Sequence, residues 1–549
     1  MTKNLLGATT VIFVLLICIA CSNSATDRPV PIDSVVSVTG GEVRSRAVEG
    51  SAVRVWEGIP YAAPPLGHLR WKPPAPVKPW ESVREVPARI PQCLQAVSSG
   101  GFFGGRDPAP QDEDCLYLNV WSAARAVDEA RPVMVWIHGG GLVSGDGSRY
   151  NGGVLAEKGA VVVTINYRLG PFGFISHPGL SAESPHSASG NYGFLDQIAA
   201  LEWVRDNIRN FGGDSGRVTI FGESSGSLSA NVMQASPLAR GLFHGAIGQS
   251  GGTFHPMAYL RETKPWADSG ETRGVAFAKA AGVAGDNDAE IVAAMRTMSA
   301  QHIFDTFASN SSLATSWVLT QVDGYVLPAE ITEIYSEGKQ TDVPVMIGSN
   351  ADEATIFADM SLDSSFGVKD YREWAENTYP ELASEIQKVY PAPNDDAAWR
   401  AYADLIGDEW FTSHARQWVR DMEKVSSPAY LYLFSYAPPI EKQSRYRAFH
   451  GAEIGYVFGM LDLLGATPGP ADKALSEVMS DAWVRFAATS DPNGLGLDRW
   501  EPFTSSNEAY MEFGETVASG DSLRMEKLDL IRRIHQAQRA SGKTSIVAR

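Results

Sequence analysis

Short apolar runs that alternate with helical patterns constrain the fold of this chain more than any other feature. Residues 133–137, 160–165 and 217–221 are rich in apolar and β-branched side chains, and glycines or polar residues follow them. Residues 195–208 repeat apolar side chains on one helical face, and glycines at 212–213 end that pattern. Strands buried on both faces and separated by helices form parallel sheets. We therefore predict an α/β fold with a large, mostly parallel central sheet flanked by helices.

Later segments extend the pattern and interrupt it twice. Residues 242–247, 343–347 and 429–434 are further strand candidates, and residues 523–534 fit one face of a terminal helix. The stretches 253–327 and 358–429 look more helical. We expect these two stretches to leave the sheet and form a helical cap. In sheets of this kind the chemistry lies at the carboxyl ends of the strands.

The first 25 residues have the outline of a signal peptide. Lys3 precedes an apolar run at residues 11–20, and small and polar residues follow. The run is short for a membrane span, so a single-pass anchor is the least favoured reading. Two endings stay open: Cys21 is the acylated first residue of a lipoprotein, or cleavage near Ala25 releases the chain. Both predict export, as a periplasmic or outer-membrane lipoprotein or as a secreted protein.

Composition excludes some partners and leaves one cysteine pair. The chain of 549 residues has 64 acidic and 46 basic residues, a net charge of −18, which repels nucleic acid. No HExxH run or cluster of Cys and His occurs, so we expect neither metal nor cofactor. Beyond the signal segment only Cys93 and Cys115 remain. In an exported chain they favour a disulfide that closes a loop of about 20 residues and stabilises by about 3 kcal/mol; two separate thiols are the alternative.

A candidate nucleophile lies in a G-x-S-x-G pattern at residues 222–226. The pattern follows the strand candidate 217–221 and precedes a helix-compatible segment, residues 228–235. A serine on such a tight turn stands clear of the sheet, and the flanking glycines relieve the crowding. Ser224 is therefore the expected nucleophile. The alternative is an ordinary glycine turn with a helix-capping serine.

Candidate oxyanion donors follow the strand candidate 133–137. Three consecutive glycines at 139–141 let the backbone aim its N–H groups at one point, as developing negative charge on a carbonyl oxygen requires. We assign the amides of Gly140, Gly141 and Ser225, the last being the residue after the nucleophile. The alternative is a flexible glycine loop. His138 is interpreted as structural.

These motifs together resemble a known family. The chain is similar to the type B carboxylesterases, α/β hydrolases that include the cholinesterases and bacterial para-nitrobenzyl-type esterases. The resemblance covers nearly the whole mature chain and rests on residues 58–62, 113–121, 139–141, 166–168, 222–224, 249–251, 322–324, 352–353 and 450–453. It implies an α/β-hydrolase catalytic domain over residues 27–545 and a Cys93–Cys115 disulfide. The cholinesterases place a tryptophan against choline between these cysteines, and this chain has none there.

The resemblance also selects the base and the acid. His450 matches the family's histidine, and in this fold the order along the chain is serine, acid, histidine. His302 and His414 are alternatives without a motif. Glu353 matches the acid that would hold one tautomer of His450, with its neighbour Asp352 as the alternative.

Ser250 resembles a hydroxyl that bonds the acid. The expected function is hydrolysis of small carboxylic esters through an acyl-enzyme on Ser224. A non-catalytic binding or adhesion protein on the same scaffold and an amidase with the same triad are the alternatives. The oligomeric state stays open.

Overall fold

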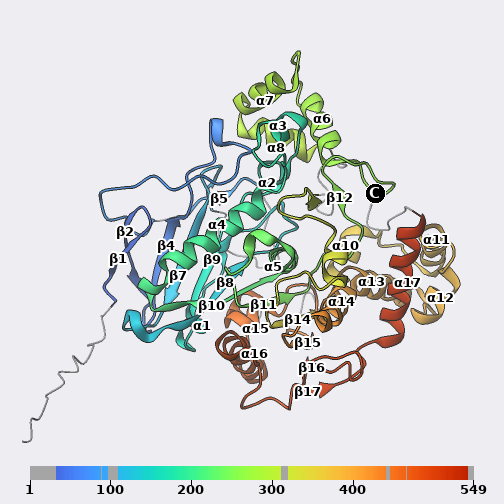
Figure 1. Ribbon diagram of the computed structural model, residues 1–549. Coiled ribbons are helices and arrows are strands. Elements are labelled where there is room, and N and C mark those ends of the chain that lie inside the picture. The colour runs from blue at the N-terminus through green and yellow to red at the C-terminus, as the bar shows by residue number, and fades with distance from the viewer. Residues whose placement is uncertain are drawn as a thin grey trace, which may run out of the picture.

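The computed structural model describes residues 32–87, 89–96, 109–310, 319–440, 445–464 and 467–541. The predicted signal peptide and Cys21 lie outside these ranges. A sheet of 11 strands forms the centre of the described part, in the spatial order β17-β16-β15-β14-β11-β10-β8-β9-β7-β4-β3 (Figure 1). Its strands are β3 (Arg46–Ala47), β4 (Arg54–Pro60), β7 (Tyr117–Ser122), β8 (Arg131–Ile137), β9 (Val161–Ile165), β10 (Gly213–Glu223), β11 (Gly245–Gln249), β14 (Val345–Asn350), β15 (Ala429–Phe434), β16 (Tyr510–Phe513) and β17 (Val517–Gly520).

The central strands run parallel, and the two edges are antiparallel. Strands β9, β8, β10, β11, β14, β15 and β16 pair in parallel in that order. Strands β3, β4 and β7 continue the sheet antiparallel on one side, and β17 does so on the other. Three small two-stranded sheets lie outside it: β1 (Val35–Val38) with β2 (Gly41–Arg44), β5 (Gln92–Cys93) with β6 (Gln111–Asp112), and β12 (Ala258–Tyr259) with β13 (Gln321–Val322). The mostly parallel sheet expected from the sequence is confirmed.

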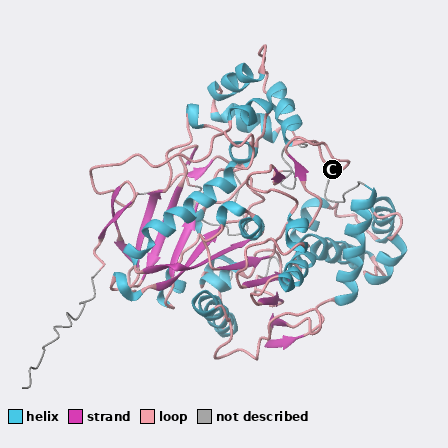
Figure 2. Cartoon of the chain, viewed as in Figure 1, coloured by secondary structure: helices cyan, strands magenta, loops and turns pink. Residues whose placement is uncertain are grey.

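Both faces of the sheet are buried, which explains the uninterrupted apolar runs. Along β8, Val133, Val135 and Ile137 belong to one hydrophobic cluster. Met134 and Trp136 belong to the other, because successive strand side chains point to opposite faces. Helices α4, α5 and α14 cover the first face, and α1, α15 and α16 cover the second. Figure 2 shows helices (cyan) on both sides of the magenta sheet.

The helices outside these two layers gather in two lobes. Helices α3, α6, α7 and α8 form the upper lobe in Figure 1, and α11, α12, α13 and α17 pack together on the right. The two expected excursions supply α6 to α8 and α11 to α13, while α3 and α17 come from outside the predicted stretches and α14, within the second one, packs on the sheet. The helices are α1 (Gly153–Glu157), α2 (Gly170–Phe174), α3 (Pro178–Glu183), α4 (Tyr192–Asn207), α5 (Ser225–Ala235), α6 (Gly270–Ala280), α7 (Asp288–Thr297), α8 (Ala300–Ala308), α9 (Ile331–Ser336), α10 (Thr355–Ser361), α11 (Val368–Thr378), α12 (Ala383–Val389), α13 (Asp395–Gly407), α14 (Ser413–Asp421), α15 (Ile454–Phe458), α16 (Pro470–Thr489) and α17 (Met525–Ser541).

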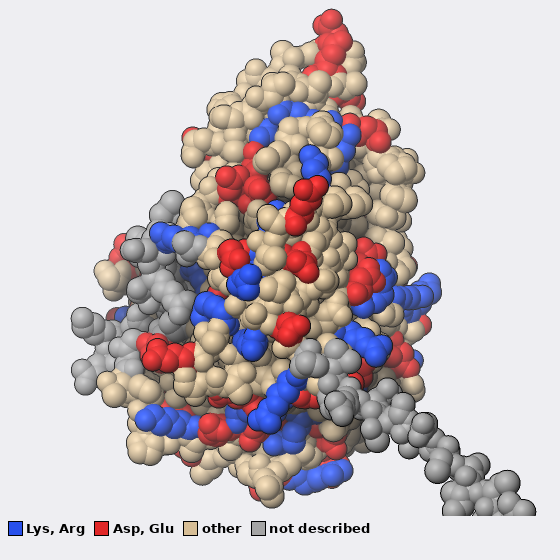
Figure 3. All heavy atoms as spheres, turned by 90° about the vertical axis from the view of Figure 1, so that its left-hand side faces the viewer, with Lys and Arg blue, Asp and Glu red and all other residues tan. Residues whose placement is uncertain are grey.

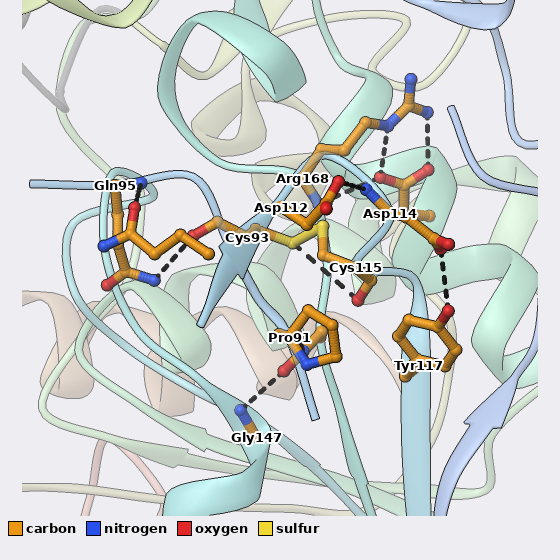
Figure 4. Close-up of a disulfide and its surroundings, with 12 residues drawn as sticks. Pro91, Cys93, Gln95, Asp112, Asp114, Cys115, Tyr117, Gly147 and Arg168 are labelled. Atoms are coloured by element: carbon orange, nitrogen blue, oxygen red, sulfur yellow. Dashed lines mark hydrogen bonds and ion pairs between the residues drawn. A yellow bond between two sulfur atoms is a disulfide. The ribbon is translucent and has the colours of Figure 1, made fainter. Parts of the chain in front are cut away.

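Among the described residues, no helix has the length and apolar character needed to cross a membrane. On the face shown in Figure 3, acidic and basic side chains are interspersed. The predicted disulfide is confirmed: Cys93 and Cys115 are bonded, with 5.0 Å between their Cα atoms (Figure 4). The bridge ties the start of β7 to the loop that carries β5.

Candidate active site

The site lies at the carboxyl ends of parallel neighbouring strands. The glycine triplet follows β8, Ser224 follows β10, Glu353 follows β14, and His450 comes after β15. Because parallel strands end at the same edge of a sheet, four segments far apart in sequence meet there. This is the edge at which the sequence predicted the chemistry.

Ser224 stands on a strained turn between β10 and α5. Its backbone has φ 57° and ψ −123°, a conformation that L residues rarely adopt. An added Cβ at Gly222 or Gly226 would collide with the carbonyl oxygen of Ile137, so only glycine fits on either side. The Ser224 side chain does not cap α5, which removes the alternative of a capping serine. From Val218 to Ser236, Ser224 is the one residue that is not buried.

The glycine loop packs directly on this turn. A Cβ at Gly139 would lie 3.1 Å from the Cβ of Ser224. The amide of Leu142 donates to Ser225 Oγ at 3.1 Å, which ties the loop to the residue after the candidate nucleophile. Gly140 and Gly141 both have positive φ, and their amides donate to no other group in the described part of the chain. These N–H groups are available to a ligand beside Ser224.

His450 and Glu353 meet as the sequence predicted. Nδ1 of His450 lies 2.6 Å from Oε2 of Glu353, and both side chains are buried. The other oxygen of Glu353 accepts from the amide of Asn350 at 2.6 Å, so the carboxylate is fixed at both atoms. His450 Nε2 has no hydrogen-bond partner among the described residues. It lies 3.1 Å from Oε1 of Glu223, the residue that immediately precedes Ser224, without hydrogen-bond alignment.

Three buried carboxylates surround the imidazole and govern its charge. Burial lowers the pKa of His450, but Glu223, Glu353 and Glu453 together raise it to about 9. Burial raises the pKa of Glu223 to about 8, against the opposing effect of His450. Burial also raises the pKa of Glu453, which accepts hydrogen bonds from Asn350 and Gln249. The environment therefore holds the pKa of His450 above the ordinary value of about 6.5.

An aromatic wall covers the imidazole, and the sequence did not reveal it. The ring of Phe411 lies 4.3 Å from that of His450, and the ring of Phe357 lies 5.3 Å away. Phe411 belongs to a π-helical segment, Asp408–Thr412, between α13 and α14. Such segments often occur at functional sites. Nothing in the apolar pattern distinguishes this turn from ordinary helix, so no sequence signal could have found it.

Gln95 is a second residue that sequence reasoning missed. Its Oε1 accepts from the amide of Gly145 at 2.8 Å, and its Nε2 donates to the Gly145 carbonyl at 2.8 Å. Nε2 also donates to the carbonyl of Cys93 (Figure 4). The disulfide segment thereby holds the end of the glycine loop. The position of Gln95 two residues after a bridged cysteine was the only available signal.

Ser250 does not form the bond that the resemblance suggested. Its hydroxyl is buried and forms no hydrogen bond in the described part of the chain, so the expected bond to the acid is absent. The reason is local: Ser250 has φ 55°, and its amide is bound to the Gly348 carbonyl. The amide of Asn350 takes the free oxygen of Glu353 instead.

The alternative candidates lie elsewhere or hold other partners. Asp352 accepts from the amide of Ala448 at 3.0 Å and forms an ion pair with Arg400, so it braces the histidine loop from behind. His302 bonds the Ala281 carbonyl in the upper lobe, and His414 accepts from the amide of Phe254.

Comparisons with known proteins identify the family. The model of the carboxylesterase family matches residues 32–531. The chain is similar to Fumonisin B1 esterase of Sphingopyxis macrogoltabida, with 36% identity over 497 residues and 87% of each chain covered. It is similar to Carboxylesterase 1D of Rattus norvegicus, with 35% identity over 529 residues, 89% of this chain and 91% of the other. A solved structure of PNB esterase superposes with a TM-score of 0.76 at 30% identity and covers 91% of this chain and 99% of its own.

Proposed function

The chain belongs to the carboxylesterase family and is a carboxylic ester hydrolase with the α/β-hydrolase fold, and from this we propose that it acts through an acyl-enzyme on Ser224. The observation that carries the assignment is the 2.6 Å contact between His450 and Glu353 beside the turn of Ser224, the one residue of that turn that is not buried. We further propose that residues 27–545 form one catalytic domain, since the family model matches residues 32–531.

The residues of the site then divide the steps of the reaction among them. Ser224 Oγ attacks the ester carbonyl while His450 Nε2 accepts its proton, and Glu353 stabilises the resulting imidazolium. The amides of Gly140, Gly141 and Ser225 hold the oxyanion, each contributing about 3 kcal/mol to the barrier reduction. His450 returns the proton to the departing alcohol. Water, deprotonated by the same imidazole, then releases the carboxylic acid and restores Ser224.

A fluorophosphonate probe tests the nucleophile. The probe should label the wild-type protein at one serine, and peptide mass analysis should place the label on Ser224. Ser224→Ala should lose both the label and turnover of p-nitrophenyl acetate. Ser225→Ala is the matched neighbour, which should still be labelled because it keeps the backbone amide of residue 225 and the Ser224 hydroxyl, although it loses the oxygen that accepts from Leu142. Label on any other serine would refute the assignment.

The substrate is proposed only as a class. One relative is named as an esterase of fumonisin B1, and others are named only as a carboxylesterase or as PNB esterase, so the names do not agree on one substrate. Small uncharged and charged carboxylic esters therefore form the first panel. A p-nitrophenyl ester and the matched p-nitroanilide, compared at equal concentration, separate esterase from amidase activity. We expect the ester to be turned over far faster.

The N-terminal segment supports a proposal of export. Lys3, the apolar run at residues 11–20 and Cys21 are compatible with a periplasmic or outer-membrane lipoprotein, and cleavage near Ala25 with secretion. Mass spectrometry of the mature N-terminus separates the two. A diacylated or triacylated Cys21 supports anchoring. An unmodified N-terminus near residue 26 supports release.

A further inference from the structure

A pocket in the upper lobe contains a charged group without a partner. It lies between α2, α6 and α8, has an internal volume of about 20 Å³ and opens to solvent, so a ligand larger than a water would extend into its mouth. Its lining is mainly apolar, with two polar side chains besides two glycines: Phe174, Ile175, Ser176, Gly270, Arg273, Gly274, Phe277, Phe307 and Leu319. None of these residues belongs to the proposed triad or to the glycine loop.

The sequence of α6 explains how an arginine comes to line an apolar pocket. Gly270, Arg273, Gly274 and Phe277 are spaced i, i+3, i+4, i+7 and share one helical face. A Cβ at Gly274 would collide with the Ser176 carbonyl, so the two glycines let α6 lie directly on the backbone after α2. The same face that packs on the protein therefore carries the guanidinium inward.

Arg273 has no counter-charge there. Among the described residues it forms no ion pair, and its Nη1 is buried without a hydrogen-bond partner, although the side chain as a whole is partly exposed. Burial lowers the pKa of Arg273 to about 10, and Asp268 opposes this from beyond ion-pair distance. The nearby Glu271 is paired with Arg261. A guanidinium nitrogen that is buried without a hydrogen-bond acceptor is costly, and a bound anion would remove that cost.

We propose that this pocket binds an organic monocarboxylate, with the carboxylate on Arg273 and its apolar body against the phenylalanine rings. The planar guanidinium fork matches a carboxylate in two parallel hydrogen bonds. Arg273 also lies in the first turn of α6, where the helix dipole favours an anion. The three rings, Phe174, Phe277 and Phe307, favour an aryl or short alkyl body over a bare inorganic ion.

The pocket lies near the catalytic loop but apart from it. Phe307 is 3.6 Å from the position of a Cβ on Gly170, whose amide donates to the Leu142 carbonyl. The amide of Leu142 is bound to Ser225 Oγ. The carboxylic acids that ester hydrolysis releases belong to the same chemical class as the proposed ligand, but binding at Arg273 does not depend on turnover.

Benzoate is the probe, and titration calorimetry on the full chain is the measurement. The Ser224→Ala background excludes catalysis. Benzoate should bind, and uncharged benzamide should bind at least tenfold more weakly. Arg273→Met should lower the affinity for benzoate at least tenfold. Arg372→Met, which removes an exposed arginine on α11 that does not line this pocket, should not change the affinity for benzoate. Binding that survives Arg273→Met, equal binding of benzamide, or chloride competing as well as benzoate would overturn the proposal.

Unfolding in urea gives a second, independent readout. Removing an unpaired buried charge should leave Arg273→Met at least as stable as the parent without ligand. Benzoate should stabilise the parent and not the variant. If Arg273→Met fails to fold, Arg273→Lys is the test variant. Lysine keeps the positive charge but lacks the planar guanidinium, so the affinity for benzoate should fall severalfold. Unchanged benzoate affinity in that variant would overturn the proposal. Loss of Ser224 labelling by fluorophosphonate would refute the proposed function and leave these results untouched.

Discussion

Two buried histidine environments in this molecule have opposite character. His450 lies among Glu223, Glu353 and Glu453, which raise its pKa to about 9. His255 is equally buried, yet burial together with His535 and Arg539 lowers its pKa to about 3. Burial disfavours the charged imidazole in both places. The neighbouring charges therefore make the difference. The carboxylates raise the pKa of His450, whereas among the described residues no such compensation occurs at His255, whose pKa stays low.

The second environment is a structural junction. The rings of His255 and His414 lie 5.8 Å apart, and those of His414 and His535 lie 5.9 Å apart. They join the loop after β11, α14 and the terminal helix α17. Arg539 of α17 donates to Glu330 and to the Phe254 carbonyl at the same place. His414 was one of the alternatives for the base, and its surroundings explain why it cannot serve: a proton on it would face positive charge.

Replacement of each histidine by glutamine should give the largest difference in kcat. His450→Gln should lower kcat for p-nitrophenyl acetate by about 10⁶-fold, because the proton acceptor for Ser224 is lost. His414→Gln should lower kcat far less, with any loss explained by reduced stability. Steady-state kinetics with circular dichroism as the folding control makes the comparison. Equal losses in the two variants would remove the distinction between the environments.

Substitution of the two adjacent acids sharpens the assignment. Glu353→Gln should lower kcat by about 10⁴-fold, since the imidazolium loses its carboxylate and the tautomer is no longer fixed. Asp352→Asn is the matched control on the same turn. It should lower stability through its ion pair with Arg400 while keeping most of kcat. A larger kinetic loss in Asp352→Asn than in Glu353→Gln would exchange their roles.

The pH profile tests the effect of the carboxylates on His450. The base must be neutral to act, so kcat/KM should rise with pH, and its midpoint should lie above the ordinary pKa of about 6.5. Glu223→Gln removes a negative charge 3.1 Å from Nε2 and should lower that midpoint by about one unit. An unchanged midpoint in Glu223→Gln would mean that this carboxylate does not set the charge of the imidazole.

Much of the site could be predicted because its parts are local. Strands β8, β10 and β14 contain short apolar runs, and the glycine loop, Ser224 and Glu353 each follow one of these strands within a few positions. His450 lies farther from its strand, β15, and only the resemblance to the family selected it. The disulfide could be predicted because only two cysteines remain beyond the signal segment. The contacts that tune the site join residues far apart in sequence. Phe411 contacts the ring of His450 from a π-helical turn. Glu223 affects the pKa of His450 because its Oε1 lies 3.1 Å from Nε2 of that imidazole.

The failure over Ser250 has the same origin. Its place at a strand end resembled that of a serine that bonds the acid, but the direction of its side chain depends on a backbone with positive φ. One positive-φ residue redirects a hydroxyl without leaving a trace in the apolar pattern. Local motifs therefore identify which residues meet, and the tertiary structure decides which atoms bond.

The junction histidines predict acid sensitivity. The pKa of His255 is lowered in the folded protein and about 6.5 when unfolded, so the unfolded chain binds protons first and stability falls as pH drops below 6.5. The loss is about 2 kcal/mol at pH 5 for His255. Urea unfolding at pH 7 and pH 5 should show that His255→Gln loses less free energy of unfolding between these two pH values than the wild type does. His450 has the opposite sign: its stabilising effect is present below 6.5 and is lost as pH rises through about 9. Identical pH dependence in wild type and His255→Gln would contradict this account.

The smallest effect should come from the aromatic rings beside each histidine. Phe411 lies 4.3 Å from the His450 ring, and Phe254 lies 6.1 Å from the His414 ring. Phe411→Leu should lower kcat by about threefold to tenfold with little change in KM, because the imidazole gains freedom to leave its reactive orientation. Phe254→Leu makes the same change at the junction and should affect stability more than kcat. If both variants keep full kcat, the bond to Glu353 alone orients His450, and the aromatic wall contributes only to packing.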